Sequence, residues 1–130
     1  MTHRIAGIVA ALVIAGASAQ AHHSIAGAYD SNREATIDGV ITEFRFVSPH
    51  PFVDVRESRT GQAWRLEMDN RRELESIGFA ADTLKPGDRV VVTGSLGRRD
   101  ANSMYIDRLD RPADGFGYEQ VGSRPRLRAR

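Results

Sequence analysis

Three histidines are the residues of this chain best suited to chemistry, because their imidazole nitrogens can bind a metal ion. His22 and His23 are adjacent, and His50 lies between two prolines in the segment Ser48-Pro49-His50-Pro51. The prolines restrict the backbone on both sides of His50 and so help to fix the direction of its ring. The chain has no Cys, which excludes thiolate metal sites and disulfide bonds.

The residues that precede His22 have the pattern of a secretory signal peptide. Arg4 supplies a positive charge, residues 5–15 form an apolar run too short to span a bilayer, and small residues follow. Ala19-Gln20-Ala21 matches an A-x-A cleavage pattern. We therefore predict that residues 1–21 are a signal peptide, that the protein is periplasmic or secreted, and that it is not an integral membrane protein after cleavage. An uncleaved anchor is the alternative.

Cleavage after Ala21 would make His22 the first residue, so that its α-amine and its imidazole could chelate one metal ion. His23 and His50 are the candidates for a further nitrogen, and tetragonal nitrogen sites suit Cu(II) or Ni(II). Cleavage after Ala19 is also possible. His22 would then be the third residue of the chain, and a histidine at that position forms another chelate of the copper or nickel type. The sequence predicts a metal site at His22, His23 and His50, with copper as the cofactor; the alternative for His22-His23 is an exposed polar pair.

Composition excludes some classes of function. Without Arg4, the exported chain has 17 basic and 17 acidic side chains, and a formally neutral domain is a poor nucleic-acid binder. The sequence has no P-loop, no dinucleotide fingerprint and no G-x-S-x-G motif. No general acid–base pair stands out, so we expect a binding protein rather than an enzyme, with a metal ion and another periplasmic protein as candidate partners.

The elements that must position the histidines are mostly strands. Alternating or β-branched runs predict five of them: Ala35–Val47, Phe52–Glu57, Ala63–Met68, Arg89–Leu96 and Ser103–Leu109. A short helix over Asn70–Ile77 is indicated by Asn70 as N-cap, by Glu73 three residues later and by Gly78 at the end.

This order of elements predicts an all-β fold, a small five-stranded barrel of the OB type with one short helix between strands 3 and 4. We expect an N-terminal arm over residues 22–34, the barrel over residues 35–111 and a disordered basic tail over residues 112–130. The tail is expected because the apolar pattern stops after Pro112 and four arginines lie in the last seven residues.

An alternative function does not involve a metal. The barrel could be a binding module whose aromatic face takes a partner protein or an apolar small ligand. The residues of this face would be Phe44, Phe46, Phe52 and Trp64.

Five features of the sequence resemble a family of small exported bacterial proteins known only as a domain of unknown function. They are Ala21 at the signal end, His22-His23-Ser24, Tyr29-Asp30, Ser48-Pro49-His50, where the family usually has Asn in place of Ser48, and Lys85-Pro86-Gly87-Asp88. The resemblance covers about residues 1–110. It implies export and a small β-fold, and it supplies no activity.

Overall fold

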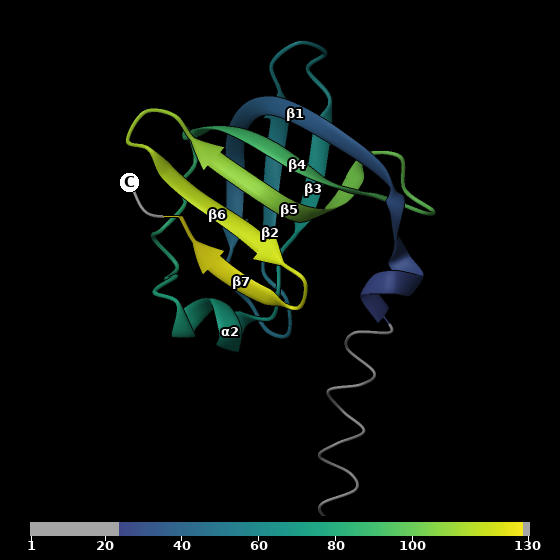
Figure 1. Ribbon diagram of the computed structural model, residues 1–130. Coiled ribbons are helices and arrows are strands. Elements are labelled where there is room, and N and C mark those ends of the chain that lie inside the picture. Colours follow the sequence, from purple (N-terminus) through teal and green to yellow (C-terminus); the bar gives the residue numbers. More distant parts are fainter. Residues whose placement is uncertain (1–23, 129–130) are drawn as a thin grey trace, which may run out of the picture.

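The computed structural model describes residues 24–128, in which the long strand β1 (Tyr29–Arg45) is the organising element. Its first part pairs with β4 (Arg89–Gly97) and its second part with β2 (Phe52–Glu57), so that β1 belongs to both halves of the sheet (Figure 1). Gly39 pairs with both neighbours, and a Cβ there would collide with the carbonyl oxygen of Arg56. The glycine inside the run is therefore required by the close approach of β2.

The sheet closes on itself into a small barrel. The strand order is β3-β2-β1-β4-β5-β6-β7, and a parallel pairing of β3 (Ala63–Glu67) with β5 (Ser103–Arg111) joins its two halves. All other pairings are antiparallel. The predicted all-β, OB-like fold is confirmed, and residues 24–128 form seven strands rather than the five predicted.

The short helix α2 (Arg71–Ser76) lies between β3 and β4, where the sequence predicted a helix. The side chain of Asn70 accepts a hydrogen bond from the backbone N–H of Glu73 at 3.0 Å, which is the expected cap. Gly78 follows the helix with a φ of 98°, a conformation that favours glycine. Leu74 is the buried residue of the helix.

One contiguous apolar core fills the barrel and the space beneath α2. Side chains on alternating positions of β2, β3, β4 and β5 supply most of it, as the binary pattern predicted. Its members are Ile37, Ile41, Val53, Val55, Leu66, Met68, Leu74, Phe79, Leu84, Val90, Val92, Met104, Ile106, Leu109 and Tyr118.

The prediction of a disordered tail from residue 112 is wrong for the described part of that segment. β6 (Phe116–Val121) pairs with β5, and β7 (Arg124–Leu127) pairs with β6 (Figure 1). Tyr118 is fully buried in the core, and its ring lies 5.7 Å from that of Phe79. Two of the arginines are neutralised locally, since Arg126 pairs with Glu119 and Arg128 with Asp110.

The predicted arm also differs from the structure. Residues 24–28 are helical, and the strand begins at Tyr29 instead of Ala35. Tyr29 and Asp30 pair with the end of β4, after which the register shifts before Glu34. Backbone pairing does not require an apolar period, so the polar composition of this stretch did not indicate a strand. Within residues 24–128, no helix is long and apolar enough to cross a membrane.

Candidate functional site

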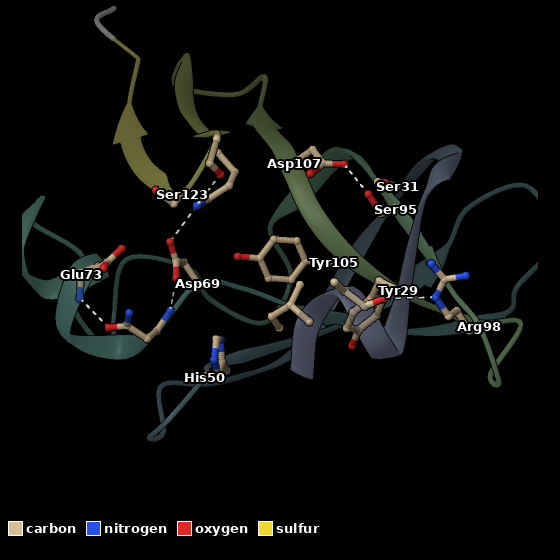
Figure 2. A pocket seen from close by; sticks show the side chains of 15 residues that line it. Tyr29, Ser31, His50, Asp69, Glu73, Ser95, Arg98, Tyr105, Asp107 and Ser123 are labelled. Carbon is tan, nitrogen blue, oxygen red and sulfur yellow. Dashed lines mark hydrogen bonds between the residues drawn. The ribbon is translucent and has the colours of Figure 1, made fainter. Parts of the chain in front are cut away.

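A pocket of about 360 Å³ lies beside the N-terminal helical segment (Figure 2). Its walls come from segments far apart in the sequence: residues 25 and 26, the start of β1, the β1–β2 loop with His50, the start of α2 with the two residues before it, the end of β4, the strand β5, and the β6–β7 hairpin. The polar and aromatic side chains that give it its chemistry are Tyr29, His50, Asp69, Glu73, Arg98, Tyr105, Asp107 and Gln120.

His50 lines this pocket with a fixed ring orientation. Its Nδ1 lies 2.8 Å from the carbonyl oxygen of Met68, and because a carbonyl only accepts, Nδ1 carries the proton and donates. In the neutral ring, Nε2 is then the atom with the free lone pair, and it has no hydrogen-bond partner among the described residues. His50 is only 9% exposed, so its ring is held by the surrounding protein.

A carboxylate and a phenol stand behind the His50 ring. One oxygen of Glu67 lies 3.8 Å from Nδ1 of His50, and the other accepts a hydrogen bond from the Tyr29 hydroxyl at 2.6 Å. Burial, together with the hydrogen bond to the Glu67 carboxylate, raises the pKa of Tyr29 well above its usual value. The phenol therefore stays protonated, and it links Tyr29, the first residue of β1, to the Glu67 carboxylate beside His50.

Asp69 is buried and is held by two hydrogen bonds from different parts of the chain. Its Oδ1 accepts from the backbone N–H of Asn70 at 2.6 Å, and its Oδ2 accepts from Gln120 Nε2 at 2.7 Å. Gln120 in turn accepts from the hydroxyl of Tyr118 at 2.9 Å. Sequence reasoning missed Gln120 because its segment was expected to be disordered; the spacing of Phe116 and Tyr118 by two residues was the available signal.

Tyr105 and Asp107 lie on the pocket side of β5, opposite the core residues Met104 and Ile106. Ser95 donates a hydrogen bond to one oxygen of Asp107 at 3.1 Å. Burial raises the pKa of Asp107 despite this bond, and the charge of Glu34 adds to the effect. Burial also raises the pKa of Tyr105 far above its ordinary value, so that its hydroxyl is a permanent donor.

Of the three histidines predicted as metal ligands, the structure places one. His50 lies in the pocket wall, whereas His22 and His23 lie outside the described residues. Ile25 and Ala26, which follow them closely in the sequence, line the same pocket as His50. In residues 24–128, no three His, Asp or Glu side chains are grouped so that they could hold a metal ion.

The aromatic residues of the alternative binding face contact other parts of the protein. Phe44, Phe46 and Trp64 are partly buried against the core. The guanidinium group of Arg71 lies over the ring of Phe46 at 4.9 Å, and that of Arg45 lies over Phe52 at 5.8 Å.

One solved structure resembles this chain in fold, and a second matches it more weakly. A chain of the S. pombe Stn1-Ten1 complex matches with a TM-score of 0.50 and 19% sequence identity, over 63% of this chain and 62% of that one. A chain of the ZRD-deleted mutant of TiaS in complex with agmatine matches with a TM-score of 0.48 and 15% identity, over 63% of this chain and 22% of that one. The matches therefore span less than two thirds of either solved chain.

No curated protein matches the sequence. A family model does match, over residues 10–105. This range holds the second part of the predicted signal peptide, the three histidines after residue 20, the strands β1 to β4 and the start of β5. Since the match covers well over half of the chain, the protein belongs to the family of unknown function DUF6152.

Proposed function

We propose that this protein is exported to the periplasm and binds a transition metal ion there, most readily copper. The ligands would be the α-amine and imidazole of His22, the imidazole of His23 and Nε2 of His50. Three imidazoles and an amine form an all-nitrogen donor set, which Cu(II) prefers in tetragonal geometry.

The observation that carries the proposal is the position of His50 relative to the start of the described chain. His50 and Ile25 line one pocket, and only two residues separate Ile25 from His22. Ser24 is already helical, so only His22 and His23 can extend, and at about 3.3–3.6 Å per residue they reach about 7 Å beyond it. That reach allows the first residues of the cleaved chain to approach the free nitrogen of His50.

The surroundings of His50 fit a ligand role. Metal-binding histidines usually donate their second ring nitrogen to a carbonyl or a carboxylate, which fixes the tautomer and the ring direction. Here Nδ1 donates to the Met68 carbonyl, with the Glu67 carboxylate close by. The ring is therefore already oriented before any metal ion binds.

Cu(II) electron paramagnetic resonance on the processed protein tests the proposal. We expect nitrogen hyperfine structure, and we expect it to change in a form extended by one Met before His22 and in His50→Ala. Each change removes one chelating nitrogen, whereas circular dichroism of the three proteins should stay the same. A spectrum without nitrogen hyperfine structure, or one that is identical in the Met-extended form, would rule out the N-terminal site.

A further inference from the structure

The pocket carries more hydrogen-bond acceptors than the proposed metal site uses, and they lie at two separate ends. Asp69 and Glu73 lie near His50 at one end, and Asp107 lies at the other. Figure 2 shows the ring of Tyr105 between these ends, with its hydroxyl directed toward the Asp69 side.

The charge of the pocket is negative. Among the residues that the structure describes, three carboxylates line it, those of Asp69, Glu73 and Asp107, against one guanidinium group, that of Arg98. That guanidinium group is engaged at the rim: it lies 3.6 Å from the carboxylate of Asp30 and donates to the carbonyl oxygen of Ala26 at 3.2 Å. The excess negative charge therefore favours a cationic ligand.

Two acceptors in the pocket lining, one on the buried His50 and one on the partly buried Asp107, have no hydrogen-bond partner among the described residues. One is Nε2 of His50, a residue that is nine-tenths buried, and the other is the Asp107 oxygen that Ser95 does not contact. Poorly solvated acceptors are costly unless a donor reaches them. Burial raises the pKa of Asp107, in keeping with its position in the pocket wall.

The stretch between the two ends is less polar. The ring of Tyr105 lies there, and Ile25 and Ala26 also line the pocket, so that all three offer apolar surface to a hydrocarbon chain. The volume of about 360 Å³ lies at the lower end of the range for small-molecule sites. A ligand that matches these walls is short and flexible, with a hydrogen-bond donor and a positive charge at each end.

We propose that this pocket binds a linear aliphatic diamine, with one ammonium group at the His50–Asp69 end and the other at Asp107. The ammonium groups supply donors to His50 Nε2 and to the free oxygen of Asp107, and the methylene chain lies along Tyr105. This activity goes beyond metal binding and shares only His50 with the proposed metal site.

Isothermal titration calorimetry on the processed, chelator-treated protein tests the proposal, with putrescine and cadaverine as diamines and butylamine as the matched monoamine. A charge-assisted hydrogen bond contributes about 1.5–3 kcal/mol, so a diamine should bind at least about 10-fold more tightly than butylamine. Asp107→Asn should abolish that difference, because it removes the second anionic end and keeps the shape. Asp82→Asn removes an equal charge from an exposed position outside the pocket and should leave binding unchanged.

The outcomes separate this proposal from the metal site. A diamine that binds the Met-extended form as tightly as the processed form supports the pocket site even where copper binding fails. Equal affinities for putrescine and butylamine, undiminished diamine binding by Asp107→Asn, or no binding of either diamine would overturn the proposal.

Discussion

The hydrogen bond between Tyr29 and Glu67 joins the N-terminal end of the described chain to the residues behind His50. Tyr29→Phe removes only the hydroxyl and leaves a half-buried carboxylate without its donor. Because hydrogen bonds to charged groups contribute about 1.5–3 kcal/mol, we expect the free energy of unfolding to fall by that amount in urea denaturation.

Thr60 offers a matched control, since its hydroxyl also donates to a carboxylate at 2.6 Å, on Glu57, but in an exposed turn. Thr60→Val should change stability by less than about 0.5 kcal/mol. Equal losses in Tyr29→Phe and Thr60→Val would contradict the idea that the buried bond is the stronger one.

Asp107 should make the stability of the protein fall as the pH rises. Burial raises its pKa in the folded state above the ordinary value of 3.8, so the folded state binds the proton more tightly than the unfolded state does. Stability is therefore lost as the pH rises from about that ordinary value through the raised one. Asp107→Asn, which can still accept from Ser95, should melt at a higher temperature than the wild type at neutral pH.

The same comparison at pH 3 is the control for Asp107. There the wild-type carboxyl is mostly protonated and neutral, like the amide, so the two melting temperatures should converge. A stabilisation of equal size at both pH values would mean that the charge of Asp107 is not its cause.

The residues of the site differ in how far a sequence can predict them. The alternation in β5 correctly separated Met104 and Ile106 from Tyr105 and Asp107, because side-chain direction in a strand is a local property. His50 stood out by its residue type and its flanking prolines. The contact of Gln120 with Asp69 spans 51 positions and depends on the closed sheet, so no local pattern could show it.

At the scale of elements, the β6–β7 hairpin is part of the core and of the pocket. Tyr118 is fully buried, so Tyr118→Ala should reduce the free energy of unfolding by about 3–5 kcal/mol, as for other large aromatic residues. Val121 lies in the same strand and is 50% exposed, and Val121→Ala should cost less than about 0.5 kcal/mol. Urea denaturation of both variants measures the difference, and a Tyr118→Ala protein as stable as Val121→Ala would contradict a structural role for the hairpin.

Elements with local signals were predictable, and elements held by distant pairing were not. Helix α2 follows from Asn70, Glu73 and Gly78, which act within one turn of the chain. β6 and β7 have no strong apolar run. They become strands because β5 offers an edge to β6, and acidic side chains neutralise Arg126 and Arg128. The Gly-rich and Arg-rich composition of this segment thus indicated disorder, whereas pairing with the sheet makes β6 and β7 ordered strands.

At the scale of the whole molecule, metal binding should appear as a gain in stability that depends on correct processing. A ligand that binds only the folded state at 100 times its Kd stabilises it by about 2.7 kcal/mol. We expect Cu(II) to raise the melting temperature of protein whose N-terminal sequencing begins His22-His23-Ser24, and not that of the Met-extended form. An equal rise in both forms would point to copper sites elsewhere on the chain.

The overall fold followed from the order of elements, because strand–strand–strand–helix–strand–strand with a long first strand is compatible with few closed sheets. The residues that line the pocket could not be predicted from that order of elements. The pocket is assembled from segments far apart in the sequence, around residues that each have an ordinary structural interpretation, and only the closed barrel brings them together.

The irregularity in β1 has a consequence for amide hydrogen exchange. Tyr29 and Asp30 pair with the end of β4, the ladder is then interrupted, and pairing resumes at Glu34. The residues before the interruption are held by few backbone bonds, whereas Ile37 and Ile41 are anchored in the core. Amides near residue 29 should therefore exchange through local opening, and those near residue 40 only through global unfolding. Because the first of these segments also walls the pocket, a ligand could enter at the rate of that local opening while the barrel stays closed.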